Sequence, residues 1–525
     1  MDGAAIIVPA YNRRGRGEDA PGGSPVPPLL TAFLGALLAL AVLAALLVLL
    51  WRPVVRSLLK GMTGTLMGRM VSNRYSENVF GVLNVMRHVG AEFFMETMMR
   101  TSEGGKPISR PMGSPLHPSP WETLYFQPVY LRPRMPTSEK VEIDTRTTIG
   151  PRAGKPLQVD IPILITAMSY GGALSVQAKV ALAKGANLAG TATNTGESYL
   201  PEERRVAERL IMQHHRGLWP NGTMNRPELL KNADAIEIQL GQGAQAAAAM
   251  KTKPTSDKMI NARMREVFGL EPGQVEEVST RFRGVDSPGD FVEMVRRLKR
   301  EHPVPVGVKL GVSDYIEADL EVLLQAEVDF VTIDGAEGGT HGGPTTLQDD
   351  VGLPTMHGLV RADDYLRKVG ERDKVTLIAA GQLSTPGHFL KALALGADAV
   401  AIGTVAIVAL LAEQMKKAMP FEPPYDLVMH SANHRWNSGL DVERGARHLA
   451  DYLQSCMGEI AYVVQSLGRT AVRDLGREDL VALDPLVGDL CGVRLAWRPR
   501  SDGGGLAVSA TWPAAEHAPA QEQIH

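Results

Sequence analysis

The stretch IAAGQLSTPGHFLKALALGADAVAIGTVAI, residues 378–407, is the part of the chain that most clearly indicates its fold. It has the pattern of a strand, a glycine turn, a helix, a second strand and a second glycine turn. In α/β barrels, the loops after the last two strands and a helix N-terminus form a phosphate site, because free backbone N–H groups and the helix dipole face the anion. The two turns predict phosphate binding at Gly381, Gln382, Gly403 and Thr404, with two ordinary tight turns as the alternative.

The same alternation of short β-branched runs and helical segments begins at Ile161, which is typical of a parallel sheet or barrel. The candidate strands cover residues 161–168, 235–240, 305–310, 329–335, 374–381 and 398–403. A doubly wound sheet shows the same alternation, but no GxGxxG motif follows the first strand. We therefore predict an α/β fold with a (β/α)8 TIM barrel over residues 135–428, whose working residues lie at the C-terminal ends of the strands.

Before the barrel, Leu29–Leu50 is an apolar run of 22 residues without a charge. At about 1.5 Å per residue, a helix of this length crosses the roughly 30 Å of membrane hydrocarbon. Trp51 and Arg52 follow the run, where a signal peptide would have a small-residue cleavage site, so we predict a retained transmembrane helix. The small excess of Lys and Arg after the run predicts that the main domain is cytoplasmic.

Composition and periodicity assign the remaining segments. Residues 1–28 and 501–525 are rich in Gly, Pro or Ala, and we predict that both are disordered tails. Residues 51–134 are predicted to be a juxtamembrane helical segment and a linker. Residues 429–500 have an apolar helical face, which predicts a helical C-terminal extension that caps the domain or joins subunits.

Charge and cysteine content exclude several classes of protein. Lys+Arg 55 against Asp+Glu 58 gives a formal charge of -3 without a long basic run, so nucleic acid is not an expected partner. The two cysteines, Cys456 and Cys491, are too few for the disulfide framework of a secreted protein and indicate a reducing compartment. They lack metal-ligand spacing, and no second histidine is suitably spaced from His341, so we predict no metal site.

Polar residues follow the other candidate strands. Lys309 ends the apolar run PVGVKL, and because a buried lysine is costly without a partner, we expect it to face an anion at the barrel mouth. In a flavin enzyme that anion is the N1/O2 edge of the ring; a lysine that reaches solvent is the alternative. The glycine-dense loop DGAEGGTHGGP (334–344) brings backbone amides to the same rim, which AMSYGG (167–172) and TNTGES (193–198) line with short polar side chains.

Taken in order, these motifs resemble the FMN-binding synthase domain of glutamate synthase and its stand-alone relatives. The resemblance spans about residues 135–475 and rests on ITAMSYGGALS, ATNTGE, NADAIEIQLGQGA, VGVKL, IDGAEGGTHGGP, AAGQLSTPG and AIGTVAIVAL. It implies a (β/α)8 barrel with FMN at the C-terminal ends of the strands. It also implies amination of 2-oxoglutarate to an imine, which the flavin reduces to glutamate.

Carried over position by position, the resemblance implies specific contacts. The flavin would lie against Ala167, Met168, Ser169, Asn194, Gln239 and Lys309. The ring and phosphate would be held by Gly338, Gly339, Gly381, Gln382, Gly403 and Thr404. The substrate would lie near Thr195, Gly196, Glu197 and Gln242, with Arg216 as a clamp, since a guanidinium binds carboxylates bidentately. Lys309, Glu197 and Gln242 are the residues predicted to be catalytic.

The chain departs from this family in three places. No cysteine precedes Cys456, so we expect no cysteine-nucleophile glutaminase domain, and ammonia or a separate subunit would supply nitrogen. Residues 410–430 contain no cysteine, so we expect no iron-sulfur centre. GAQAAAAM (243–250) and VSTRFRGVD (278–286) replace the Lys-Pro-Gly and Pro-Pro-His stretches of the family, which leaves the substrate open.

Three functional readings follow. The first is an FMN-dependent oxidoreductase that reductively aminates a 2-oxo acid. The second keeps the flavin barrel but acts on another amine or an N-alkylated amino acid, as the replaced loops suggest. The third is a membrane-docked flavin protein that transfers electrons or serves as a scaffold. No nicotinamide fingerprint is present, so the sequence leaves the electron donor open, and a separate protein that donates electrons or nitrogen is one candidate partner.

Overall fold

The computed structural model describes residues 28–72, 83, 86–87, 89–102, 108–110, 113–131, 133–251, 261–274, 277–340, 343–420, 424–429 and 439–500. The predicted disordered tails lie outside the described residues, apart from Pro28. The chain divides into two compact units, residues 1–105 and residues 106–525, and each is described by itself.

The first unit contains helix α1 (Pro28–Ser72) and helix α3 (Ala91–Ser102). Helix α1 includes the predicted membrane span and continues through Pro53. An 18-residue window within its segment Ala32–Ser72 has a mean hydropathy of 3.0, and the segment is long and apolar enough to cross a membrane. A signal sequence near an N-terminus has the same properties, so a retained anchor stays a prediction.

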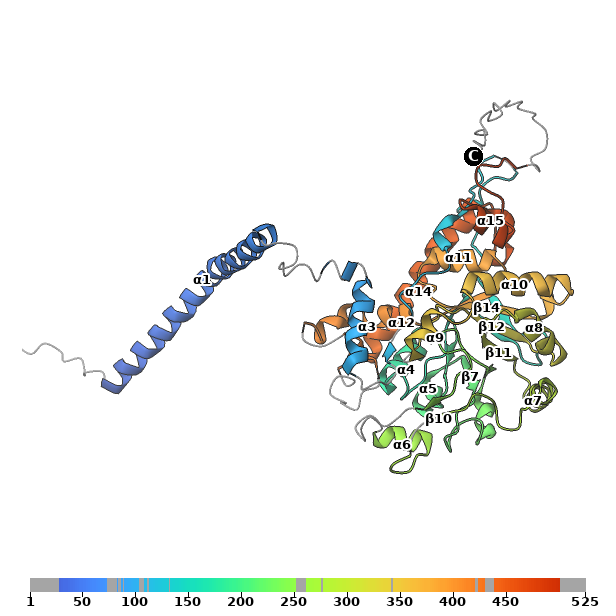
Figure 1. The fold of residues 1–525 in the computed structure, drawn as a ribbon, viewed down its shortest axis with the longest axis horizontal. Coiled ribbons are helices and arrows are strands. Elements are labelled where there is room, and N and C mark those ends of the chain that lie inside the picture. Colours follow the sequence, from blue (N-terminus) through green and yellow to red (C-terminus); the bar gives the residue numbers. More distant parts are fainter. Residues whose placement is uncertain are drawn as a thin grey trace, which may run out of the picture. The chain divides into compact units, whose positions relative to one another are not determined.

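The second unit is built on eight parallel strands (Figure 1). They are β5 (Ile163–Ile165), β6 (Thr193–Asn194), β7 (Leu210–His214), β8 (Ala235–Gln239), β11 (Val306–Gly311), β12 (Phe330–Asp334), β14 (Thr376–Ala380) and β15 (Ala399–Ile402). Their order in the sheet is β5-β15-β14-β12-β11-β8-β7-β6. Between β5 and β6 the Ile165 N–H donates to the Ala192 carbonyl at 3.0 Å, and Ala167 forms a β-bridge with Asn194. The strands thus form a nearly closed barrel, which confirms the predicted fold class.

The six candidate strands are all present, but two further strands, the two-residue β6 and the longer β7 (LIMQH), were not among them. The run LIMQH is buried along its whole length and ends in polar residues without a glycine or proline. Because a strand buried on both faces lacks alternation between polar and apolar residues, it carries no period-2 signal.

Helices cover the outside of the barrel (Figure 1). They are α4 (Val176–Leu188), α5 (Pro201–Val206), α7 (Pro288–Glu301), α8 (Ile316–Gln325), α10 (Thr355–Lys368), α11 (Pro386–Ala394) and α12 (Thr404–Leu411). Helix α7 shows why these segments are helical: Ser287 and Asp290 form a capping box, and Pro288 occupies the first turn. The buried side chains of α7 then recur at helical spacing, at Phe291, Val292, Val295 and Leu298.

A hairpin closes the N-terminal end of the barrel, which we call the base. Strands β3 (Thr147–Ile149) and β4 (Leu157–Val159) pair in antiparallel fashion. Their buried side chains Ile149, Leu157 and Val159 join a cluster with strand residues such as Leu164 and Phe330. This apolar plug fills the lower barrel, so a ligand can enter only from the opposite end, the mouth.

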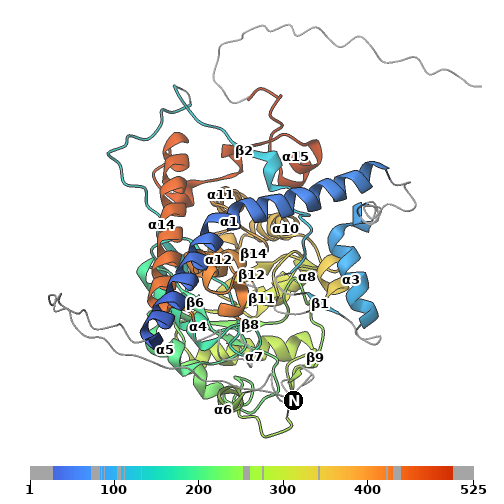
Figure 2. The ribbon, with the colours of Figure 1, turned by 90° about the vertical axis from the view of Figure 1, so that its left-hand side faces the viewer.

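The C-terminal extension contains α14 (Val442–Ser466), β16 (Leu480–Ala482) and α15 (Pro485–Cys491). Helix α14 runs beside α12 and α4 (Figure 2). A side chain at Gly185 of α4 would place its Cβ 2.8 Å from Cδ2 of Leu449 on α14, so glycine permits this close approach. The extension therefore forms an outer layer on the barrel helices.

Residues 108–110 and 113–123, which the sequence assigns to the linker, belong to the second unit. Strand β1 (Ser109–Arg110) pairs with β13 (Gly343–Pro344). The Ser119 hydroxyl donates to the Glu337 carboxylate at 2.5 Å, and the Trp121 ring stacks on His388 of α11. We call residues 108–110 and 113–123 the strap, because they hold the loops that follow β12 and β14.

Candidate functional site

A layer of polar side chains fills the barrel above its apolar plug. At its centre the Glu237 carboxylate of β8 accepts hydrogen bonds from Asn194 Nδ2 at 3.0 Å, Gln213 Nε2 at 2.9 Å and Thr332 Oγ1 at 3.0 Å. These residues lie on four different strands, and alternate strand residues point into a barrel. Glu237 was not among the predicted site residues, although an acidic residue within the apolar run AIEIQL indicates that it has a buried partner.

Lys309 lies in the same layer. Its Nζ is 3.0 Å from Asp334 Oδ2, and the two side chains are only 4% and 7% exposed. Burial alone would lower the pKa of Lys309, but Asp334 and Glu237 outweigh burial and hold the pKa above its usual value. The lysine is therefore a charged, buried group at the end of β11, which excludes the solvent-reaching alternative.

Residues 193–198, which comprise β6 and the turn after it and which we call the 193–198 loop, meet the loop after β5. Gly196 has φ +63, and a Cβ there would lie 2.7 Å from the Ser169 backbone nitrogen. Next to it, the Glu197 N–H donates to Ser169 Oγ at 3.0 Å. Burial raises the pKa of Glu197, although a hydrogen bond from Gln239 and the charges of Arg216 and Lys309 oppose this effect. Glu197 thus lies among the residues with which the sequence groups it.

Arg216 makes contacts with the backbone that the sequence does not indicate. Its Nη1 donates to the carbonyls of Ala247, Ser279 and Thr280 at 3.1, 2.9 and 2.8 Å. These carbonyls belong to the segments between β8 and α7, so the guanidinium holds those segments near the end of β7. The Nε of Arg216 is buried and has no hydrogen-bond partner within the described part of the chain. One donor is therefore available to a ligand.

Two glutamines line the mouth next to Glu197. Gln239 Nε2 donates to Gln242 Oε1 at 3.4 Å, and Gln242 Nε2 lies 3.5 Å from Thr340 Oγ1. The Oε1 of Gln239 is buried without a hydrogen-bond partner among the described residues. By contrast, the Thr195 hydroxyl already accepts from the Gln213 N–H at 3.0 Å and donates to the Gly196 carbonyl at 2.8 Å. Gln239 is thus better suited than Thr195 to bind a ligand through its side chain.

The predicted phosphate residues surround the start of α12. Gly403 is the N-cap of this helix, and no side chain caps its first turn, so backbone N–H groups there are free for an anion. Gly381 has φ +118, and a Cβ there would lie 2.2 Å from Thr355 Oγ1. Gln382 also has a positive φ, of 49°, and its Nε2 donates to the Ser114 carbonyl of the strap.

Three other predicted residues belong to the same rim. A Cβ at Gly338 would lie 2.6 Å from Asp334 Oδ1, and a Cβ at Gly113 of the strap would lie 2.9 Å from the Cα of Gly339. Met168 Sδ would be 3.9 Å from a Cβ at Gly403. The end of β5, the first strand, therefore lies next to the end of β15, the last. His341 lies outside the described residues.

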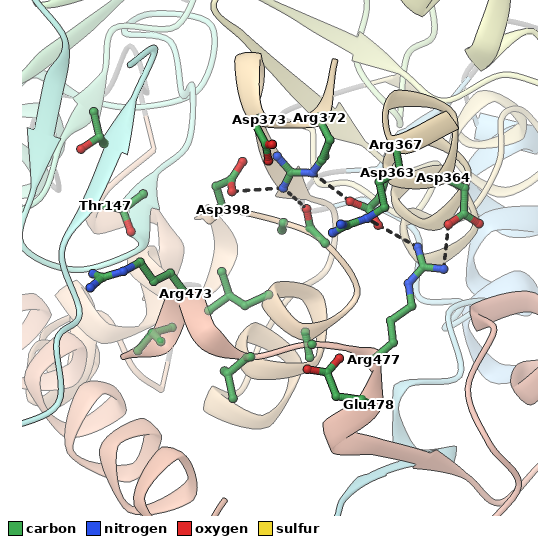
Figure 3. Close-up of a pocket in the computed structure, with 18 of the residues that line it drawn as sticks. Thr147, Asp363, Asp364, Arg367, Arg372, Asp373, Asp398, Arg473, Arg477 and Glu478 are labelled. Atoms are coloured by element: carbon green, nitrogen blue, oxygen red, sulfur yellow. Dashed lines mark hydrogen bonds and ion pairs between the residues drawn. The ribbon is translucent and has the colours of Figure 1, made fainter. Parts of the chain in front are cut away.

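A second group of charges lies at the base, around a cavity of about 750 Å³ (Figure 3). Asp363 of α10 pairs there with Arg367 at 2.8 Å, Arg372 at 2.8 Å and Arg477 at 2.9 Å. Asp373 and Asp398, which also line the cavity, come shortly before β14 and β15, so the cavity is at the end opposite the predicted site. Of these arginines, Arg477 joins the C-terminal extension to α10.

Comparison with known proteins shows that the chain resembles the conserved region of glutamate synthases. A family model described as the conserved region in glutamate synthase matches residues 120–470. A glutamate synthase large subunit-like protein of Rhizobium meliloti is 32% identical over 388 residues, which cover 68% of this chain and 83% of the relative. An archaeal-type glutamate synthase [NADPH] of Thermotoga neapolitana is 29% identical, and the match covers 63% of each chain.

The solved structures that resemble the chain are more distant. A mandelate oxidase mutant with a monooxide FMN adduct is 14% identical, with a TM-score of 0.42 and coverage of 68% of this chain and 87% of the other. A flavocytochrome b2 mutant has a TM-score of 0.43 at 16% identity, with coverage of 79% and 88%. The match of the family model to residues 120–470 covers more than half of the chain, and the protein therefore belongs to the family defined by the conserved region of glutamate synthase.

Proposed function

We propose that the protein is an FMN-dependent oxidoreductase of glutamate synthase type, which converts 2-oxoglutarate and ammonia, or nitrogen from a partner subunit, to glutamate through an imine. The main support is one observation: the buried Lys309 ammonium lies at the same barrel end as the uncapped N-terminus of α12. A fixed cation and an anion-binding helix end at one mouth fit a ring with a phosphate tail.

FMN would be held by two sets of residues. Its phosphate would bind the N–H groups at the start of α12 and the turns at Gly381, Gln382, Gly338 and Gly339. Its ring would lie against Ala167, Met168, Ser169, Asn194, Gln239 and Lys309. The unpaired Gln239 Oε1 fits this arrangement, because an N–H at the ring edge would satisfy it. Bound FMN would supply the hydride transfer that side chains do not perform.

The chain's own residues have separate roles in this proposal. Lys309 places a positive charge where negative charge develops at the ring edge. Glu197 has a raised pKa, so its carboxyl keeps a proton to higher pH than an ordinary glutamate and can exchange it with the substrate nitrogen. The free Nε of Arg216 would donate to a substrate carboxylate, and Gln242 would help to orient the substrate.

A specific observation favours a second candidate, an oxidoreductase that acts on another amino acid or an N-alkylated one. Within the described part of the mouth, the carboxylates Glu197, Glu237 and Asp334 face only two cations, Lys309 and Arg216. Because unlike charges attract, this balance favours a substrate with a cationic nitrogen over a dianion.

The proposal places the protein at a membrane through residues 29–50, with its barrel in the cytoplasm and a separate protein as electron donor. The supporting observation is the apolar, exposed segment Ala32–Ser72. Protease treatment of intact spheroplasts tests this placement. We expect the barrel to be protected until the cells are lysed, and cleavage from outside would contradict the orientation.

Spectroscopy of the detergent-purified protein tests the chemistry. We expect the visible spectrum of bound flavin, and we expect photoreduced protein under anaerobic conditions to be reoxidised when 2-oxoglutarate and ammonia are added together. Either compound alone serves as the control, since both are needed to form the imine.

The outcomes separate the readings. A protein without a visible cofactor would contradict both flavin enzymes. Reoxidation by neither compound, combined with reduction of the oxidised protein by an amino acid, would support the second candidate. A spectrum that no such compound changes would favour an electron-transfer or scaffold subunit.

A further inference from the structure

A buried ion pair lies behind the mouth and has no role in the proposed chemistry. Nζ of Lys179 on α4 is 2.9 Å from Oε1 of Glu203 in the first turn of α5. The two side chains are 1% and 0% exposed, so neither reaches solvent. The sequence reading singled out neither residue.

Such a pair contributes little to stability. Burial lowers the pKa of Lys179 and raises that of Glu203 to about 7, although each charge opposes the shift of the other. Apolar residues of similar volume are often as stable as a buried pair, or more so, because desolvation offsets the attraction between the charges. The contacts of the lysine therefore indicate what the pair does.

Lys179 also holds the backbone of the loop at residues 193–198. Its Nζ donates to the carbonyls of Asn194 at 2.7 Å and Thr195 at 3.3 Å, two successive groups of that loop. One cation thus determines the direction of two peptide units, immediately before Gly196 and Glu197.

The direction of these peptides determines the positions of the side chains that face the mouth. Asn194 Oδ1 accepts from the Gly196 N–H at 3.0 Å, while its Nδ2 donates to Glu237 at 3.0 Å. Glu197 follows and donates its N–H to Ser169. A rotation of the peptides that Lys179 holds would therefore displace both Asn194 and Glu197.

We infer that Lys179 and Glu203 are positioning residues: they fix the carbonyls of Asn194 and Thr195 so that Asn194 and Glu197 meet the cofactor and the substrate. The part of this inference that concerns cofactor and substrate rests on the proposed function. The part that concerns the loop does not.

A matched control lies at the base. Lys299 of α7 pairs with Asp329 at 2.8 Å and also donates to a backbone carbonyl, that of Glu327. Asp329 comes directly before β12, far along the strands from the mouth. Both pairs combine a lysine, a carboxylate and backbone carbonyls, but only Lys179 contacts the loop of the site.

The test compares Lys179→Met/Glu203→Gln with Lys299→Met/Asp329→Asn in the full-length protein. Amide hydrogen exchange is measured by mass spectrometry on peptides that cover residues 193–198, and FMN affinity is measured by titration of the deflavinated protein. We expect the first variant to exchange at least tenfold faster in this loop and to bind FMN at least tenfold more weakly. The control should change neither, and peptides from β12 and β14 should remain protected in both.

Loop exchange within twofold of the wild type in the first variant would overturn the inference. If that variant does not fold, Lys179→Gln replaces it, since its shorter side chain gives up the bonds to both carbonyls. Failure of both variants to fold would also overturn it, because the pair would then serve the fold as a whole. If the wild type binds no FMN, the proposed function fails, but the exchange measurement still decides the role of the pair in the loop.

Discussion

At the base of the barrel, Asp363 is a single buried carboxylate among three guanidinium groups, whereas at the mouth the buried ammonium of Lys309 lies among the carboxylates of Asp334, Glu237 and Glu197. Figure 3 shows Arg367, Arg372 and Arg477 around Asp363, with Arg477 reaching it from the C-terminal extension. The base groups are paired at 2.8–2.9 Å, and their exposure ranges from 1% for the Asp363 side chain to 61% for that of Arg367. The mouth groups are enclosed, and Gln239 and Arg216 keep unpaired polar atoms.

The difference indicates that the charged groups at the base stabilise the fold, whereas the polar groups at the mouth are suited to bind a ligand. Ion pairs between segments that are distant in sequence, such as Arg477 with Asp363, fasten the C-terminal extension to the barrel. Buried polar atoms that lack a partner cost stability unless a ligand satisfies them. Such atoms lie at the mouth, so substitutions at the two ends should have different consequences.

The largest expected effect is on stability, at the base. Asp363→Leu would leave three arginines without their common carboxylate, and breaking a buried pair in this way costs about 3–5 kcal/mol. Urea denaturation measures the loss. Asp364→Asn is the control, because Asp364 is 55% exposed and an exposed pair contributes less than about 1 kcal/mol. A loss of FMN affinity in folded Asp363→Leu would contradict the separation of the two ends.

The next effect is on the reaction, at the mouth. We expect Lys309→Met to lower the rate of flavin reduction or reoxidation by about 100-fold, or about 2.7 kcal/mol, because the fixed cation at the ring edge is lost. Stability should fall as well, since Asp334 loses its partner. Stopped-flow absorbance measures the rate, and Lys299→Met at the base should leave it unchanged. A normal rate in flavin-loaded Lys309→Met would remove this residue from the site.

Two glycines, one at each end of the barrel, provide a matched comparison, and the expected effect is intermediate in size. Gly381 has φ +118 with Thr355 beside it, and Gly396 has φ +116 with Asp363 beside it. Alanine at either position is strained, and we expect each variant to lose about 1–3 kcal/mol of stability. Only Gly381→Ala should also weaken FMN binding in a fluorescence titration. Equal FMN affinities in the two variants would remove the Gly381 turn from the phosphate site.

The smallest effect concerns pH. Burial lowers the pKa of His214 to about 4, so the folded protein keeps this residue neutral while the unfolded chain protonates it near its usual pKa. The unfolded state therefore binds more protons between about pH 6.5 and 4, and stability decreases as the pH falls. His214→Phe retains an aromatic ring beside Phe282 and should reduce this slope by about 1.4 kcal/mol per pH unit. Urea denaturation at several pH values measures it, and an unchanged slope would show that His214 is protonated in the folded state.

Much of the fold was predictable from local pattern. The strand predicted at 235–240 is β8 (Ala235–Gln239), and the one predicted at 329–335 is β12 (Phe330–Asp334). Their buried runs end in polar or glycine residues, which mark strand ends in the sequence. Strand β7 also ends in polar residues, but its run LIMQH has only one β-branched residue, Ile211, and the role of Glu237 depends on partners from three other strands.

The barrel, the rim motifs and the membership in the glutamate synthase family can be inferred from the amino-acid sequence, because strand periodicity, turn glycines and motif order are local properties of the chain. The pairing of the buried charges, in contrast, depends on how the strands and helices are arranged in space. The register that sets Lys309 beside Gln239 on one side and Thr332 on the other brings Glu237 and Asp334 to the ammonium. Likewise, the packing of α4 on α5 joins Lys179 to Glu203. Electrostatic partners depend on distance in space, which neither spacing nor composition reveals.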